Sequence, residues 1–172
     1  ISRHQAPTHG KRSGRLVSRS AILSNGRLAV GIDEHGFVHD FYYPHVGLNN
    51  LTSARSVHHK IGIWVDGQFS WLDDRGWSSE AKLDEHSMIN HTVFVSKALG
   101  VSIHFRDFVD SDQDFFVRVA IVENRLDKKR EVRLFFGQIF QISRGGRADT
   151  ALYTMAKHPY ILVYNRHTSF IT

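Results

Sequence analysis

Residues 25–47 read NGRLAVGIDEHGFVHDFYYPHVG, and this stretch decides the fold. The pair Asn25-Gly26 is a typical tight-turn sequence, and it precedes a run with apolar residues at every second position. A second turn sequence at 33–36 leads into another extended run, residues 37–43. Turn residues that separate runs of period-two alternation are typical of a β-hairpin. The stretch therefore predicts two antiparallel strands followed by a loop.

Strand signals separated by turns continue along the rest of the chain. A second hairpin is centred on Asp66-Gly67, and strands are expected at residues 61–65, 68–72, 77–83, 88–96, 101–106, 115–122, 132–136, 160–164 and 169–172. The best helical candidate, residues 150–157, is short and lacks a capping pattern. Repeated short strands joined by hairpin turns predict an all-β fold, an antiparallel β-sandwich.

Two of the expected strands are apolar at nearly every position rather than at every second one. They are residues 115–122 and 132–136. A strand with one solvated face alternates between apolar and polar residues, so these two runs predict strands that are covered on both faces.

Length and charge bound the domain organisation. The chain has 172 residues, of which 41% are hydrophobic and 23% charged, as in a single globular domain. The formal net charge is +5, but residues 1–20 hold five basic side chains and no acidic one, so residues 21–172 are neutral overall. We expect a flexible basic leader at 1–20, one domain at 21–172, and no nucleic-acid partner.

Two absences in the sequence bear on location. No apolar run approaches the roughly 20 residues that a membrane-spanning helix requires, so no membrane association is expected. The sequence contains no cysteine, which fits a reducing compartment. We expect a cytoplasmic location.

Residues that often bind metals are present, but not in patterns that make a site. His58 and His59 are neighbours, so on a strand they point to opposite faces and cannot hold one metal ion together. The acidic run at 110–114 resembles the first half of a calcium loop, but the glycine and the final glutamate of such a loop are missing. We expect no metal and no cofactor.

Paired carboxylates are also present, at 33–34, 73–74 and 84–85. All three pairs fall in or beside predicted turns, where acidic residues are common. Glycoside hydrolysis instead needs two carboxyl groups that face each other across a sugar bond. We therefore expect no catalytic residue in this chain.

Aromatic and polar residues indicate two candidate contact surfaces. One is the loop after the first hairpin, and the other is one face of the second hairpin, where an aromatic surface can stack on sugar rings or pack against another domain. The candidates for the rim of a substrate site or for domain contact are Tyr42, Tyr43, His45, Asn49, Asn50, Phe69 and Trp71. Ordinary packing within the sandwich is the alternative for each aromatic residue.

The chain resembles the amino-terminal domain of glycoside hydrolase family 15, the prokaryotic glucoamylase-like and trehalase-like enzymes. Four segments carry the resemblance in order and spacing: NGRLAVGIDEHGFVHDFYYPHVGLNN, HHKIGIWVDGQFSWLDD, FRDFVD and NRLDKKREVRLFFGQIFQI. It covers about residues 21–170. It implies a supersandwich, similar to galactose-mutarotase-like domains, that precedes an (α/α)₆ barrel.

In that family the barrel holds the two catalytic glutamates, which act by inversion on α-glucosides. This chain is expected to stop before the barrel, so no catalytic residue is carried over. It also departs from the family pattern at two places. A stretch that resembles Gly-x-Glu-Asn-His in the family is Gly47-Leu48-Asn49-Asn50 here, and a Phe-Phe-His-like triplet is residues 135–137, Phe-Phe-Gly.

The resulting hypothesis is a non-catalytic amino-terminal domain of an α-glucoside-hydrolysing enzyme. Its expected partners are the barrel of the same protein and an α-glucan or trehalose substrate at the barrel's rim. A stand-alone carbohydrate-binding β-sandwich is the alternative, and saturable glycan binding by the isolated chain would favour it.

We expect the isolated chain to self-associate, most simply as a two-fold homodimer. Residues 169–172 are predicted to begin a strand, and an edge with unpaired backbone groups is a template for another chain. Apolar surface meant for the barrel adds to the tendency. Light scattering at high protein concentration checks this expectation, and a clean monomer would contradict it.

Overall fold

The fold is an antiparallel β-sandwich, as the sequence predicted. The computed structural model describes residues 19–52, 58–143 and 147–172, and these residues form thirteen strands and no helix. The strands are β1 (Arg19–Ser24), β2 (Ala29–Asp33), β3 (Val38–Tyr42), β4 (Lys60–Val65), β5 (Gln68–Trp71), β6 (Ser78–Leu83), β7 (Asn90–Ser96), β8 (Val101–Val109), β9 (Phe116–Asn124), β10 (Val132–Gly137), β11 (Thr150–Thr154), β12 (Tyr160–Asn165) and β13 (Thr168–Ile171). Within the described ranges, no helix is long and apolar enough to cross a membrane.

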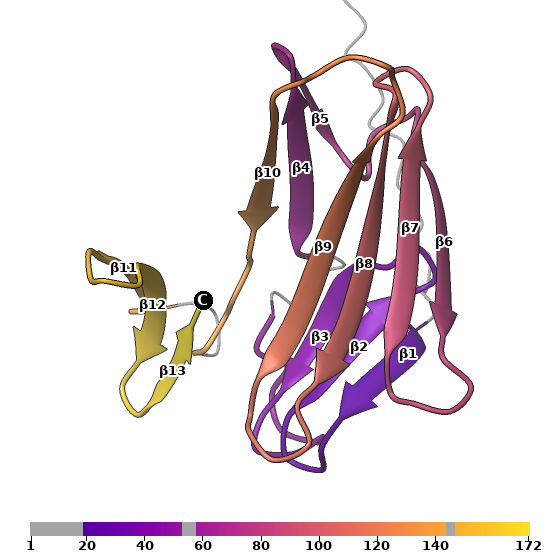
Figure 1. Cartoon of the computed structure of the whole chain (residues 1–172). Helices are drawn as coiled ribbons and strands as arrows, with labels where there is room; N and C mark the ends of the chain where they lie inside the picture. The colour runs from indigo at the N-terminus through magenta and orange to yellow at the C-terminus, as the bar shows by residue number, and fades with distance from the viewer. Residues whose placement is uncertain (1–18, 53–57, 144–146) are drawn as a thin grey trace, which may run out of the picture.

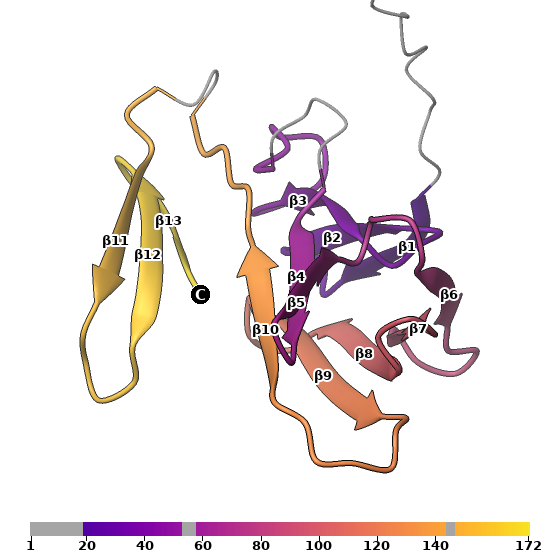
Figure 2. The ribbon, with the colours of Figure 1, turned by 90° about the horizontal axis from the view of Figure 1, so that it is seen from above.

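The described strands form four antiparallel sheets, with the orders β1-β2-β3, β10-β4-β5, β6-β7-β8-β9 and β11-β12-β13. Most neighbours are joined by hairpins, but β10 pairs with β4 across a large part of the chain, with Leu134 opposite Ile63. The first three sheets make the body of the molecule, and β11-β12-β13 stands beside it (Figures 1 and 2). Phe170 on β13 links this last sheet to the body, because its ring stacks on Phe140 at 4.4 Å and meets Phe41 at 5.5 Å.

Two apolar clusters hold the body together. The first lies between sheets β10-β4-β5 and β6-β7-β8-β9, and its buried members are Phe37, Ile61, Ile63, Val65, Leu72, Phe94, Leu99, Val101, Ile103 and Phe105. The second lies under sheet β1-β2-β3, and its buried members are Ala21, Leu23, Leu28, Val30, Ile32, Val38, Phe41 and Leu51. Alternate residues of each strand enter a cluster because side chains point to opposite faces of a strand in turn.

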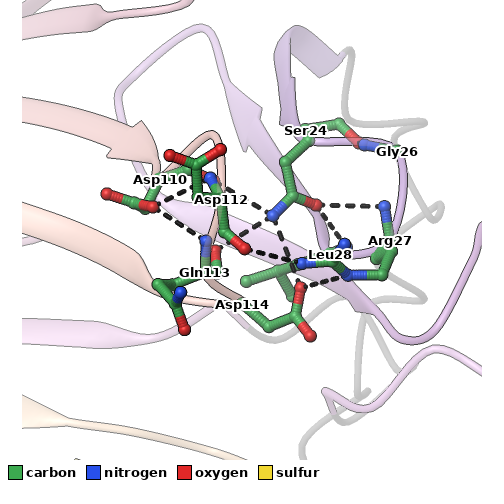
Figure 3. Close-up of polar contacts among 9 residues, drawn as sticks. Ser24, Gly26, Arg27, Leu28, Asp110, Asp112, Gln113 and Asp114 are labelled. Atoms are coloured by element: carbon green, nitrogen blue, oxygen red, sulfur yellow. Dashed lines mark hydrogen bonds and ion pairs between the residues drawn. The ribbon is translucent and has the colours of Figure 1, made fainter.

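Asn25 does more than make a turn. Its Oδ1 accepts the backbone N–H groups of Arg27 and Leu28, which closes the turn between β1 and β2. Its Nδ2 donates to the backbone carbonyls of Asp110 and Gln113, both at 3.0 Å, in the loop between β8 and β9. The sticks in Figure 3 show this meeting of two loops that lie 85 residues apart in the sequence. One side chain thus ties two sheets together.

The structure corrects the prediction that residues 115–122 and 132–136 are covered on both faces. Ala120, Val122 and Leu134 pack against the first cluster, but Ile121 and Phe135 are exposed on the opposite faces of their strands. An apolar run shows that both faces of a strand could be buried. It does not show that another segment of the chain packs on the second face.

The start of the domain also differs from the expectation. Most of the expected leader lies outside the described residues, but β1 begins at Arg19, inside it, and the sequence analysis did not predict this strand. Residues 150–157 include β11, whose partner is β12. Residues 169–172 fall on β13, which pairs with β12.

A single methyl group at Gly36 is expected to destabilise the fold strongly. Gly36 has φ +86°, and a Cβ there would overlap with the side chain of Thr92. Gly26 is a matched control, because it has φ +89° but open space around its Cα. Gly26→Ala should lower the free energy of unfolding by about 1 kcal/mol, because alanine is strained in the left-handed region. Gly36→Ala should lower it by about 1–3 kcal/mol more, because the new methyl group also overpacks against Thr92. Urea unfolding of both variants measures the difference; equal losses would contradict the prediction.

Candidate functional site

Five of the seven predicted site residues lie at the end of β3 or in the loop that follows it, and the far end of this loop is fixed by Asn50. The Oδ1 atom of Asn50 accepts the backbone N–H groups of Phe41 at 3.0 Å and Thr52 at 3.1 Å. Its Nδ2 donates to Asp40 Oδ1 at 2.7 Å. Thr52 adds a hydrogen bond from its hydroxyl to the backbone carbonyl of His39. Asn50 is therefore committed to holding the loop, and its amide is not free to contact a ligand.

Tyr43, at the near end of the loop, is exposed and lies near the carboxylate of Asp114. Asp114 accepts a hydrogen bond from Arg27 Nε at 2.8 Å. Burial raises the pKa of Asp114, but the hydrogen bonds from Arg27 and Asn25 outweigh this effect and hold the pKa below its usual value. Figure 3 shows the contact between Asp114 and Arg27.

Between Tyr43 and Asn50 the loop is exposed. Val46 is 62% exposed and Leu48 45%, while His45 and Asn49 are also exposed and Tyr42 is half-buried. Gly47, at φ +105°, provides a reversal that a side chain would strain. The loop thus presents two aliphatic side chains to solvent and is fixed by Asn50 at its far end.

The other two predicted residues lie elsewhere. Phe69 and Trp71 are on β5, in sheet β10-β4-β5, whereas the loop follows β3 of sheet β1-β2-β3. The structure thus places the candidates in two groups on different sheets. It adds Trp64 and Phe135 to the second group: Arg133 and Trp64 pair across β10 and β4, and the Phe135 ring lies 5.6 Å from that of Phe69. The sequence analysis missed Phe135 because its neighbours come from a distant part of the chain.

The paired carboxylates are used within their turns, as the sequence predicted. Asp33 Oδ1 accepts the N–H groups of His35 and Phe37. Asp74 and Asp84 accept backbone N–H groups in the same way. Asp110 closes the turn at the acidic run by accepting from Asp112 and Gln113. These contacts give each carboxylate a local structural role.

Asp33 also belongs to a buried hydrogen-bonded pair. Its Oδ2 lies 2.7 Å from His39 Nε2, and both side chains are buried. Burial raises the pKa of Asp33, but the hydrogen bonds from His39 and from the backbone of Phe37 and His35 outweigh it, so the pKa is lowered. A general acid in glycoside hydrolysis needs a raised pKa. Asp33 therefore lacks the property that an acid catalyst requires.

His58 and His59 point to opposite sides, as predicted. His58 stacks on Phe37 at 4.4 Å between ring centroids, whereas His59 meets the edge of Phe140 at 5.0 Å. His58 Nε2 lies 3.2 Å from Asp73 Oδ2 in a geometry that makes no hydrogen bond. Burial lowers the pKa of His58, against the opposing effect of Asp73. The two imidazole rings therefore pack in two different places and do not face each other.

Comparison with known proteins gives one relative. Over 137 residues, 78% of this chain, the sequence is 27% identical to a protein of Methanocaldococcus jannaschii named an uncharacterized glycosyl hydrolase. The chain spans about one fifth of the length of that relative, 21%. This similarity supports a relationship to glycoside hydrolases but does not single out family 15. No protein-family model matches the chain. No solved structure matches it either.

His59 should make the fold sensitive to acid. Burial, followed by the nearby charge of Arg118, lowers the pKa of His59 from 6.5 to about 4. Below pH 6.5 His59 therefore binds a proton in the unfolded chain but not in the folded chain, and the free energy of unfolding falls as the pH drops toward 4. The shift corresponds to about 3 kcal/mol lost by pH 4.

The measurement is the free energy of unfolding between pH 7 and pH 4 for the natural chain and His59→Gln. The variant should lose less stability across this range, because glutamine does not titrate. His158→Gln, at an exposed histidine, is the matched control and should leave the pH dependence unchanged. Parallel curves for the natural chain and His59→Gln would show that His59 is not the titrating group.

Proposed function

We propose that the chain is the non-catalytic amino-terminal domain of an α-glucoside-hydrolysing enzyme of the glucoamylase or trehalase type. In this role it supports the catalytic barrel and contributes the loop of residues 42–50 to the barrel's surface. The all-β fold and the relative named a glycosyl hydrolase support the proposal. The proposed glucoamylase or trehalase type rests on the four sequence segments that resemble family 15.

The observation that carries the contact role is the exposed loop itself. Val46 and Leu48 expose aliphatic side chains in a loop whose far end is fixed by the hydrogen bonds of Asn50. Apolar groups held in place before binding lose little conformational freedom when a partner covers them.

The carboxylates support a non-catalytic role. Asp33 is ionised and paired with His39, and Asp74 and Asp84 are bonded to the backbone of their own turns. Hydrolysis of a glycoside needs an acid and a base on opposite sides of the bond. We assign both to the barrel, propose an α-glucan or trehalose as the substrate, and propose a cytoplasmic location on the basis of the cysteine-free sequence.

Leu48→Ser in the longer enzyme tests the proposal. The change should lower kcat for maltose or trehalose about tenfold or more, because misplacing a domain contact by a small distance disturbs the reacting geometry. In the isolated chain the same change should move Tm by no more than about 2 °C, since Leu48 is exposed. Glucose release and thermal unfolding are the two readouts.

Leu152→Ser is the matched control, because Leu152 is 49% exposed against 45% for Leu48 and lies on β11. It should leave kcat unchanged. The chain on its own should release no glucose from either sugar. Glucose release by the pure chain that disappears when one of its own carboxylates is replaced would overturn the assignment, as would equal effects of the two serine variants.

A further inference from the structure

The outer face of sheet β10-β4-β5 carries an aromatic surface. Strand register places Arg133, Trp64 and Phe69 in one row across the three strands, and Phe135, Gly62 and Trp71 in the next. The intervening residues of β4, Ile61, Ile63 and Val65, point inward and are buried in the first cluster. We call Trp64, Phe69, Trp71 and Phe135 the aromatic face.

Gly62 allows the rings to form one surface. A Cβ at Gly62 would lie 2.6 Å from Phe69 Cζ, so the Phe69 ring occupies the space where a side chain of the central strand would stand. Phe69 consequently reaches Phe135 at 5.6 Å and Trp71 at 4.8 Å between ring centroids. Phe69 is 47% exposed and Phe135 44%. The rings of Trp71, Phe69 and Phe135 thus touch one another, and Phe69 and Phe135 are open to solvent.

Charged groups lie over this surface rather than around it. Lys60 Nζ lies 5.5 Å from the centroid of Trp71, and the Arg133 guanidinium lies 5.0 Å from that of Trp64. Each cation also has a carboxylate partner: Lys60 Nζ is 3.1 Å from Asp73 Oδ2, and Arg133 Nε is 2.9 Å from Glu131 Oε1. The aromatic face is therefore close to neutral, yet it has hydrogen-bond donors and acceptors among its rings.

These features together select a class of ligand. Single-stranded nucleic acid also stacks on aromatic rings, but it needs an excess of positive charge along the groove, and both cations here are paired. Protein–protein interfaces are enriched in aromatic residues and Arg but depleted of Lys, Glu and Asp, whereas here Lys60, Asp73 and Glu131 accompany the rings. The apolar C–H face of a pyranose ring can stack on the aromatic rings, and its hydroxyl groups can hydrogen-bond to the paired charged side chains.

We propose that the aromatic face binds a neutral oligosaccharide, with sugar rings on Phe69 and Trp71 and hydroxyl groups at the Lys60–Asp73 and Arg133–Glu131 pairs. This site is separate from the loop of residues 42–50, and it does not depend on the proposed enzyme. It holds equally for a chain that acts alone.

Calorimetric titration of the purified chain with maltoheptaose tests the proposal, and cellohexaose distinguishes an α-linked from a β-linked ligand. Saturable binding of either sugar is expected. Phe69→Ala and Trp71→Ala should each weaken it about fivefold or more. Gly62→Ala should also weaken it, although it removes no ring, because the new Cβ displaces Phe69. Tyr153→Ala, at an exposed tyrosine on β11, is the control and should leave binding unchanged.

Tryptophan fluorescence gives a readout that needs no variant, since a sugar on this face should shift the emission of Trp64 and Trp71. Absence of saturable binding for both sugars would overturn the proposal. Binding that survives Phe69→Ala and Gly62→Ala in folded variants would also overturn it, because the ligand would then lie elsewhere. If sedimentation shows that Phe69→Ala turns a dimer into a monomer while neither sugar binds, the face joins two copies of the chain instead.

Discussion

The ion pair between Arg118 and Asp107 is the interaction on which the arrangement of the sheets depends. Asp107 is completely buried on β8, and Arg118 Nε and Nη2 on β9 each lie 2.7 Å from one of its carboxylate oxygens. Nη2 also donates to the backbone carbonyl of Gly36, in the turn between β2 and β3. The guanidinium lies over the rings of Phe105 and Phe116, which belong to the two different apolar clusters. Removing either partner would leave a buried charge without compensation, which is far costlier than losing an exposed pair.

Polar contacts of this kind orient the sandwich, whereas the apolar clusters supply most of its stability. Asn25 ties the β1–β2 turn to the β8–β9 loop, and His39 on β3 hydrogen-bonds to Asp33 on β2. Burial of apolar area is not directional, so it does not fix one angle between two sheets. Buried polar groups must find specific partners, because an unpaired one is costly. The positions of the sheets, and so of the loop after β3, follow from these few directional contacts.

The two proposed contact surfaces differ in chemistry. The loop with Val46 and Leu48 presents aliphatic groups, which fits the second domain that we propose as its partner. The aromatic face presents rings together with paired charges, which fits the hydroxyl-rich ligand that we propose for it. The loop follows β3 of sheet β1-β2-β3, whereas the aromatic face belongs to sheet β10-β4-β5. In the proposed enzyme, one surface would assemble the two domains and the other would hold a chain of sugars.

The sequence by itself determined most of the strands, the hairpin turns and the class of fold, but not β1 or β11. Turns such as Asn25-Gly26 and Asp66-Gly67, and the period-two pattern around them, act through local backbone geometry that adjacent residues already define. Only the tertiary structure decided that Asn50 fixes the end of the loop by hydrogen bonds, that Phe135 lies beside Phe69, and that Ile121 remains exposed. Each of these depends on pairing between distant segments, and a local pattern shows that a face is apolar without showing which segment covers it.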